Sequence, residues 1–169
     1  MLFRSLEPGA EVTVVDAALD DVHVRGEGGL MGLAVHPRPA GETGPVQFTA
    51  CQTFLKGVRP VDVRLRTWEL SADGASAQQV RDIVTGLPVN PSGRHSGCRL
   101  TFAPDGTLLV GTGDTADGSL PQDLTSLGGK VLRIDPATGG MPEGNPFPDA
   151  TDSGQRLVYS YGHRNVQGV

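Results

Sequence analysis

The sequence predicts an all-β protein built from short strands, and three observations indicate this fold class. First, glycine and proline are abundant, with 24 and 13 residues in a chain of 169, and they cluster in the manner of turns. Second, apolar and polar residues alternate in VDVRLRTWEL, residues 61–70, with the period of two that marks a strand. Third, strand-like runs end near positions 36, 71, 103 and 135, a spacing of about 31–35 residues that resembles a weak internal repeat. Regularly spaced short strands are typical of sandwiches, barrels and propellers, and the repeat favours a propeller.

The first strand candidates each lead into a turn. GGLMGLAVHPRPAGETG, residues 28–44, places an apolar run before a segment rich in proline and glycine. Residues 61–70 should form a strand with one buried face and one wet face, followed by the turn SADG. The expected buried residues are Val61, Val63 and Leu65, and the expected wet ones are Asp62, Arg64 and Arg66. AQQVRDIVTGL, residues 77–87, predicts a weaker returning strand.

The second half of the chain predicts a hairpin and a further strand. Residues 99–103 and 107–112 flank Pro-Asp-Gly, in which proline presets one backbone angle and glycine accepts positive φ. GGKVLRIDPATGG, residues 128–140, repeats the pattern of an apolar run followed by a turn. No segment combines a helical period with capping residues, so we expect no α-helix.

Length and charge limit the function classes. The length fits a single domain, residues 1–169, by the usual size of 100–200 residues. Fourteen basic and nineteen acidic residues give a net charge of −5, which argues against binding nucleic acid or an acidic membrane surface. No apolar run approaches the roughly 20 residues of a membrane span. The start of the chain, MLFRSLEPGAEV, lacks the apolar core of a signal peptide.

The two cysteines, Cys51 and Cys98, permit two states. A reducing compartment would leave two thiols, whereas an oxidising one would allow a disulfide across a long loop. The sequence leaves this open, with the disulfide as the less favoured state.

Four turns concentrate reactive side chains beside glycines, which let a backbone approach a ligand closely. They are RGEGG with Glu27, GRHSGC with His95, GTGDTADG with Asp114, and GHRNVQG with Arg164. Together they carry an acid, a base and a cation, so we expect a shared site. A histidine can accept a proton from an alcohol, a carboxylate can fix its tautomer, and an arginine can stabilise a developing oxyanion.

Other chemistries fit these motifs less well. GTGDTA matches a dinucleotide fingerprint, but Gly118 and Pro121 follow where that motif requires a helix. A Cys98–His95 pair on a strand would point to opposite faces, and Cys98 is more typical of a small buried residue. The four histidines and two cysteines lack the spacing of a zinc site. Asp114 and Asp117 could be paired carboxylates of a glycosidase, but aspartates in a solvated turn are the simpler interpretation.

Five stretches in this order resemble the soluble PQQ-dependent aldose dehydrogenases, the glucose/sorbosone dehydrogenase family. They are EGGLMGLAVHP, HSGCRLTFAPDGTLLVGTGD, QDLTSLGGKVLRIDP, NPF and YGHRNVQG, and they span residues 27–168. The resemblance implies a six-bladed β-propeller that uses pyrroloquinoline quinone (PQQ) and calcium. It further implies oxidation of the anomeric hydroxyl of an aldose to a lactone, an external electron acceptor, and a periplasmic or secreted full-length protein.

The resemblance also implies roles for individual residues. His95 matches the base that takes the proton of the anomeric hydroxyl, and Asp114 matches the carboxylate that orients it. Arg164 and Asn165 match groups that hold PQQ, with the arginine polarising the reacting carbonyl, and Gln167 supports the same loop. Beyond these, Glu27 lies where the family contacts the sugar, whereas Lys130 and His163 are interpreted as structural.

The resemblance has departures, and one of them concerns length. Arg94 precedes His95 where some glucose-oxidising members carry an acid, and Val166 replaces a usual proline. The family extends further at both ends, and its calcium ligands are expected downstream of GHRN. We therefore expect residues 1–169 to be a partial propeller of roughly three blades, truncated at both ends. Such a piece should be inactive and poorly stable alone, because a propeller protects its sheet edges by closing the ring.

Two other functions stay open at this point. A non-catalytic propeller could bind protein or carbohydrate, since a fold does not determine a function. A hydrolytic propeller of the lactonase type would need several acidic or amide metal ligands, and few are present. The joint presence of His95, Asp114 and Arg164 favours the dehydrogenase.

Overall fold

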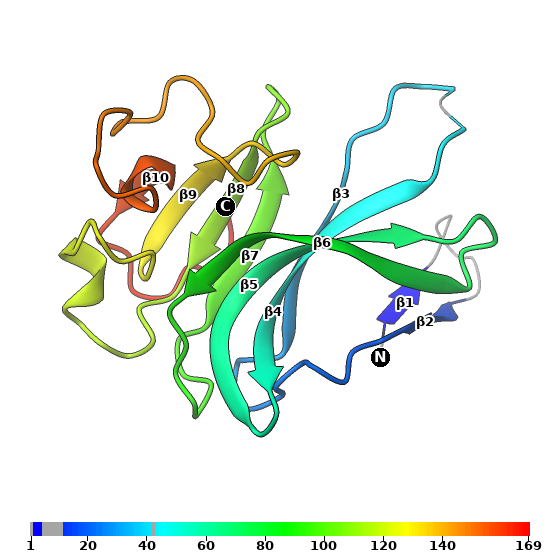
Figure 1. The fold of residues 1–169 in the computed structure, drawn as a ribbon, viewed down its shortest axis with the longest axis horizontal. Coiled ribbons are helices and arrows are strands. Elements are labelled where there is room, and N and C mark those ends of the chain that lie inside the picture. The colour runs from blue at the N-terminus through cyan, green and yellow to red at the C-terminus, as the bar shows by residue number, and fades with distance from the viewer. Residues whose placement is uncertain (1, 5–11, 42) are drawn as a thin grey trace.

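The computed structural model describes residues 2–4, 12–41 and 43–169, and these residues form strands, turns and two short 3₁₀ helices (Figure 1). No helix in this part of the chain is long and apolar enough to cross a membrane. The strands are β1 (Leu2–Arg4), β2 (Thr13–Ala17), β3 (Leu30–Val35), β4 (Val46–Lys56), β5 (Arg59–Leu70), β6 (Ser76–Leu87), β7 (Gly97–Phe102), β8 (Leu108–Thr112), β9 (Lys130–Ile134) and β10 (Val158–Tyr161), and the 3₁₀ helices are η1 (Leu120–Gln122) and η2 (Gln155–Leu157).

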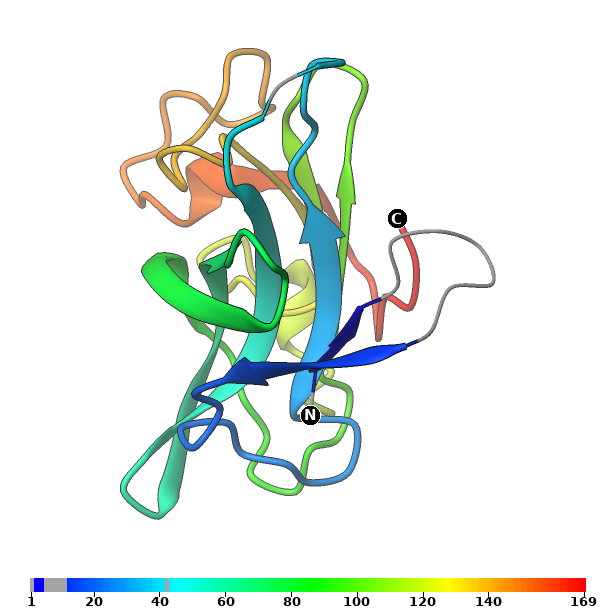
Figure 2. The same cartoon turned by 90° about the vertical axis from the view of Figure 1, so that its right-hand side faces the viewer.

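The strands pair as two four-stranded antiparallel meanders. β3 to β6 pair in chain order, and so do β7 to β10. A β1–β2 hairpin extends the first sheet to six strands, with β2 parallel to β6. Figure 1 shows β7 to β10 beside β3 to β6, and Figure 2 shows the hairpin crossing in front of the first sheet. Four-stranded meanders of this kind are propeller blades, so the predicted all-β, partial-propeller fold is confirmed, with two blades and a further hairpin among the described strands.

The spacing of about 31–35 residues in the sequence corresponds to the ends of every second strand. β3, β5, β7 and β9 end at Val35, Leu70, Phe102 and Ile134. The blades cover residues 30–87 and 97–161, so each is longer than a typical repeat of 40–50 residues. β4 is a strand that the sequence did not predict. It is buried on both faces, and its buried side chains include the polar residues Thr49, Gln52 and Thr53. Such a strand lacks the alternation by which a strand is recognised.

The main core lies between the two blades. It contains Cys51, Leu65 and Leu87 from the first blade, and Cys98, Val110 and Leu132 from the second. Cys51 on β4 and Cys98 on β7 form a disulfide with a Cα–Cα distance of 6.0 Å, and both are fully buried. The disulfide therefore joins the blades through the centre of their shared core. Of the two states that the sequence left open, free thiols or a disulfide, the structure contains the disulfide.

The expected wet face of β5 is buried, and this corrects the prediction from the alternating pattern. Asp62 and Arg66 are 7% and 3% exposed, whereas Val61 is 49% exposed. The reason is that β5 lies inside the sheet and ion pairs fill its polar face. Arg66 Nε lies 2.6 Å from Asp82 Oδ1, and Arg66 Nη1 lies 2.7 Å from an oxygen of Asp21.

A second guanidinium continues this cluster. Arg64 pairs with Asp82 at 2.8 Å and with Asp62 at 2.9 Å, and its guanidinium carbon lies 3.4 Å from the centre of the Phe54 ring. Carboxylates and the face of the Phe54 ring thus surround these arginines, in place of the solvent that the alternating pattern predicted around them.

Replacing both cysteines by alanine should lower the free energy of unfolding by about 4 kcal/mol, because the disulfide closes a long loop in the unfolded chain. Urea unfolding of the Cys51→Ala/Cys98→Ala variant measures this effect. The matched control is the unaltered protein in strong reductant, which should unfold at the same urea concentration as the variant. An unchanged midpoint in both would contradict a stabilising disulfide.

The ion cluster on β5 predicts an acid-dependent stability. Burial alone would raise the pKa of Asp82, but hydrogen bonds from Arg66 and the charges of Arg66 and Arg64 outweigh it and hold the pKa below its usual value. The stabilisation is therefore present above the unfolded pKa of about 3.9 and is lost as the pH falls through the lower folded value. Asp82→Asn should cost about 2 kcal/mol at neutral pH and progressively less in acid.

Thermal unfolding of Asp82→Asn across a pH series measures this dependence. Asp149→Asn is the matched control, because Asp149 is exposed and should show no such effect. A cost that stays constant down to strongly acidic pH would rule out ionised Asp82 as its source.

Candidate functional site

The four predicted loops meet at one edge of the two blades because of the strand directions. In each meander, odd-numbered strands begin and even-numbered strands end at the same edge. Besides the short turn between β4 and β5, that edge therefore receives four segments that lie far apart in the sequence (Figure 1). They are residues 18–29 before β3, residues 88–96 before β7, residues 113–129 after β8, and residues 162–169 after β10.

Backbone hydrogen bonds join these loops directly. The amide of Glu27 donates to the carbonyl of Gly93 at 2.9 Å, and the amide of Asp114 donates to that of Arg164 at 2.8 Å. The amide of Thr115 donates to the carbonyl of His95 at 3.3 Å. The loops therefore form one connected unit, in which each candidate residue or its neighbour contacts another loop.

His95 and Asp114 form a buried pair at the centre of this unit. The side chains are joined by a hydrogen bond of 2.7 Å between Nδ1 of His95 and Oδ1 of Asp114, and the residues are 8% and 5% exposed. The same carboxylate oxygen accepts the amide of Ala116 at 2.8 Å, which fixes its position. Because an ionised carboxylate only accepts, Nδ1 of His95 is the donor in this bond, and in the neutral imidazole Nε2 then keeps its lone pair. This pair can act as an oriented general base.

The backbone around this pair is strained. His95, Thr115 and Ala116 have φ values of 49°, 55° and 62°, in the left-handed region that favours glycine. With Cys98, they are the non-glycine residues of the described chain with positive φ. Strain of this kind persists where surrounding contacts enforce it, and it often marks functional sites.

Glu27 and Asn165 connect the first loop to the last. Nδ2 of Asn165 donates to Oε2 of Glu27 at 2.9 Å, across 138 residues of sequence. Oδ1 of Asn165 is buried and has no hydrogen-bond partner in the described structure. A buried acceptor without a partner is costly, so this oxygen can receive a hydrogen bond from a bound molecule.

Arg164 and Gln167 occupy different surroundings. Arg164 is exposed, and its guanidinium forms no hydrogen bond or ion pair with any residue that the structure describes. Its backbone carbonyl holds Asp114, so the loop position is linked to the site although the side chain is free. Gln167 points elsewhere, since its Oε1 accepts a hydrogen bond of 3.1 Å from Arg99.

The structure also tests the rival chemistries. Cys98 is bonded to Cys51, so it cannot act as a nucleophile with His95. The side chain of Asp117 is exposed and accepts a hydrogen bond from Ser119, whereas that of Asp114 is buried against His95, so the two carboxylates do not share one environment. No α-helix follows GTGDTA, and no group of three or more potential metal ligands occurs among the described residues.

Two residues that support the loops of the site could not be recognised in that role from the sequence. Nδ2 of Asn90 donates to the carbonyl of Thr115 at 2.7 Å and thereby links the second and third loops. Lys130, interpreted as structural, is fully buried beneath the third loop. The Asn-Pro pair at positions 90 and 91 is an ordinary turn signal, so no local pattern indicated this longer-range contact.

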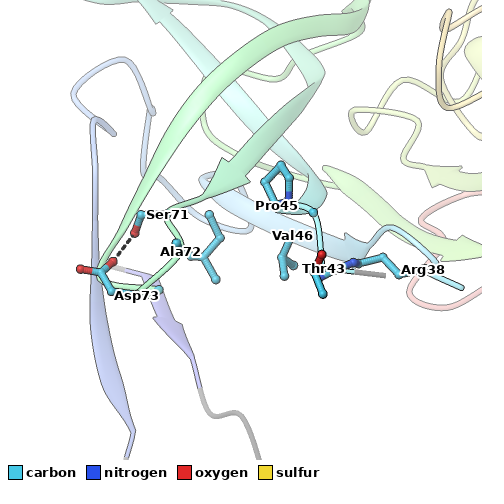
Figure 3. A pocket seen from close by; sticks show the side chains of 10 residues that line it. Arg38, Thr43, Pro45, Val46, Ser71, Ala72 and Asp73 are labelled. Carbon is cyan, nitrogen blue, oxygen red and sulfur yellow. Dashed lines mark hydrogen bonds between the residues drawn. The ribbon is translucent and has the colours of Figure 1, made fainter. Parts of the chain in front are cut away.

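A separate pocket of about 440 Å³ lies at the opposite end of β3 from Glu27 (Figure 3). It is formed by residues 43–46 with Arg38 and by the turn at residues 70–74. The hydroxyl of Ser71 donates to Asp73 within it at 2.7 Å. None of the four loops contributes to this pocket, so it is unrelated to the His95–Asp114 pair.

Gly113→Ala should displace His95, because a Cβ at position 113 would overlap the carbonyl oxygen of His95. We expect a loss of about 2–3 kcal/mol in stability and weakening of the His95–Asp114 hydrogen bond. Thermal unfolding and the chemical shift of the His95 Nδ1 proton measure the two effects. Gly118→Ala in the same loop is the matched control, since no atom lies within 4 Å of its added Cβ. Equal behaviour of the two variants would contradict the close approach of these loops.

Comparison with known proteins identifies relatives along nearly the whole chain. The family model for glucose/sorbosone dehydrogenases matches residues 5–169. Aldose sugar dehydrogenase YliI of Escherichia coli K12 is 29% identical over 167 residues, which cover 98% of this chain and 43% of YliI.

Solved structures agree with this assignment. A glucose dehydrogenase-like oxidoreductase from Thermus thermophilus superposes with a TM-score of 0.75 at 40% identity, covering 86% of this chain and 41% of that one. The PQQ-bound aldose sugar dehydrogenase of Streptomyces coelicolor gives a TM-score of 0.74 at 34% identity, covering 92% of this chain and 42% of that one. The chain thus spans less than half the length of these relatives. On the family match and the shared fold, it belongs to the glucose/sorbosone dehydrogenase family.

Proposed function

We propose that the protein is a PQQ-dependent dehydrogenase that oxidises the anomeric hydroxyl of an aldose to a lactone. The observation that carries this proposal is the buried His95–Asp114 pair, with its bond of 2.7 Å and its free Nε2. An oxidation of this kind needs a base for the hydroxyl proton, and an oriented neutral imidazole suits that task near neutral pH. Family membership supports the redox class of the reaction.

In the proposed reaction, Nε2 of His95 takes the proton of the anomeric hydroxyl. The O–H and C1–H bonds break, the C1–O bond becomes a carbonyl, and two electrons leave C1 with its hydrogen as hydride. Asp114 keeps the imidazole in the required tautomer and stabilises the positive charge that develops on it. The hydrogen bond from Ala116 prevents rotation of this carboxylate.

The residues on this edge fit PQQ as a ligand. PQQ carries carboxylates and carbonyl oxygens, and the free guanidinium of Arg164 can donate two parallel hydrogen bonds to such groups. Asn165 is held by Glu27 and presents a buried acceptor oxygen without a partner, which would receive a hydrogen bond from a donor of the ligand such as the pyrrole N–H of PQQ. When bound, PQQ supplies the acceptor for the hydride. The PQQ-bound Streptomyces relative supports this choice of cofactor.

The roles of the remaining candidates follow from their positions. Glu27 is exposed and oriented by Asn165, which suits a contact with sugar hydroxyls. Gln167 would support the Arg164 loop through Arg99. Calcium would bind through ligands outside residues 1–169, in keeping with the partial length of the chain relative to its family. An external acceptor would reoxidise the cofactor.

We also infer a periplasmic or secreted location for the full-length protein. The Cys51–Cys98 disulfide supports this location, because disulfides persist in oxidising compartments.

His95→Ala in the full-length protein should lower kcat by about 10²–10⁴, the usual contribution of a general base. The affinity for PQQ should change little, since His95 acts on the sugar. PQQ-dependent dye reduction with glucose and other aldoses measures turnover, and calorimetry measures cofactor binding.

His36→Gln provides the matched control, because His36 bonds to Thr49 at the other end of β3. This control should retain normal turnover. Near-normal turnover of His95→Ala would remove His95 from the mechanism, and absence of dye reduction by the unaltered protein with every aldose would overturn the proposed activity.

A further inference from the structure

Lys130 is a fully buried cation at the start of β9 without a carboxylate partner in contact among the described residues. Its ammonium group instead donates to three backbone carbonyls. The distances from Nζ are 2.6 Å to Gly128, 2.7 Å to Leu120 and 3.2 Å to Pro121. An ammonium group has three protons, so this set of acceptors uses its full donor capacity.

The carbonyls that Lys130 binds belong to the two ends of one loop segment. Leu120 and Pro121 lie in η1, and Gly128 lies two residues before β9. Lys130 therefore holds the two ends of residues 120–128 together, and we call these residues the 120–128 unit. A side chain without donors would leave the carbonyl of Gly128 without a hydrogen-bond partner among the described residues, whereas Leu120 would keep the amide of Asp123 and Pro121 that of Gly162. The three carbonyls would also converge without the cation between them, which the fold would have to relieve by moving the loop.

This unit and Gly129, which follows it directly, hold the two loops that carry Asp114 and Arg164. On one side, the amide of Gly129 donates to the carbonyl of Gly113, directly before Asp114, at 3.0 Å. On the other side, the amide of Gly162 donates to Pro121 at 2.9 Å and that of His163 donates to Gly129 at 3.0 Å, directly before Arg164. Pro121 thus accepts both from Lys130 and from the last loop.

Burial and charge agree with a specific role for the ammonium group. Burial lowers the pKa of Lys130, and the negative charge of Asp123 offsets part of this effect. An apolar residue at this position would avoid the cost of burying a charge. The cost of burying the ammonium group is explained if a cation is needed to hold the three carbonyls around one centre.

We propose that Lys130 is a positioning residue for the site: its ammonium group sets the spacing between the loop of Asp114 and the loop of Arg164. This inference rests on the proposed function for its catalytic consequence, but its geometric part is independent of any activity. A shift of the 120–128 unit would move Gly113 and His163 together. It would thereby change the His95–Asp114 bond and the position of Arg164.

The test compares Lys130→Met, which keeps an unbranched side chain of similar length and removes its donors, with Leu132→Ala on the same strand. Leu132 is fully buried in the core between the blades, against which Leu124 and Leu127 also pack, but among the described residues it makes no hydrogen bond to the 120–128 unit. Lys56→Met controls for loss of a lysine charge, since Lys56 is exposed. All variants are made in the full-length protein. The readouts are the melting temperature, the His95 Nδ1 proton resonance without cofactor, and turnover and affinity with PQQ.

We expect Lys130→Met to shift or broaden the His95 proton resonance and to lower kcat by up to about 10²-fold, the effect of a displacement of about 1 Å. Leu132→Ala should lower the melting temperature but keep the resonance, and Lys56→Met should change neither. The proposal is overturned if Lys130→Met keeps both the resonance and kcat, or if Leu132→Ala changes the resonance equally.

Two further conditions keep the inference testable. If Lys130→Met does not fold, Lys130→Gln replaces it, because its carboxamide has only two N–H donors and is one atom too short to serve all three carbonyls. The resonance should still shift in that variant, and an unchanged resonance there also overturns the proposal. If the unaltered protein oxidises no aldose, the proposed function fails, and the resonance alone still decides whether Lys130 positions the His95–Asp114 pair.

Discussion

The site depends on one constraint, the antiparallel order of strands within the two four-stranded blades. This order returns the chain to the same edge before β3, before β7, after β8 and after β10. The loops at that edge then bond to one another through backbone groups, as between Asp114 and Arg164. Residues separated by up to 138 positions, such as Glu27 and Asn165, can therefore share a single site without any helix or long connection.

Contact between the blades determines where the His95 loop lies. β3 of one blade packs so closely on β7 of the other that a Cβ at Gly32 would overlap the carbonyl oxygen of Cys98. Cys98, three residues after His95, is bonded to Cys51 in the first blade. The base is thus carried on a segment whose position both blades define. Such a base loses little orientation before reaction, which is the general advantage of preorganised catalytic groups.

Buried charges are satisfied in two ways in this fold, and the difference agrees with their surroundings. Arg66 lies between the carboxylates of Asp82, on the neighbouring strand β6, and Asp21, in the loop before β3, and these form a cluster with strong pairwise attraction. Lys130 lies among loop carbonyls, which offer acceptors without a formal charge. A planar guanidinium suits the first environment and a compact ammonium with three donors suits the second. Both charges are therefore part of the architecture rather than of the proposed chemistry.

The sequence by itself determined the all-β class, the turns, the family, and the four loops that meet, because these depend on local patterns and on motifs in a recognisable order. It also indicated His95 with Asp114, which the structure brings to 2.7 Å. Only the tertiary structure decided that Asp62 and Arg66 are buried, that Cys51 and Cys98 are bonded, and that β4 is a central strand. The physical reason is that burial, ion pairing and disulfide geometry depend on what neighbouring strands place opposite a residue, and alternation along one strand carries no record of those neighbours.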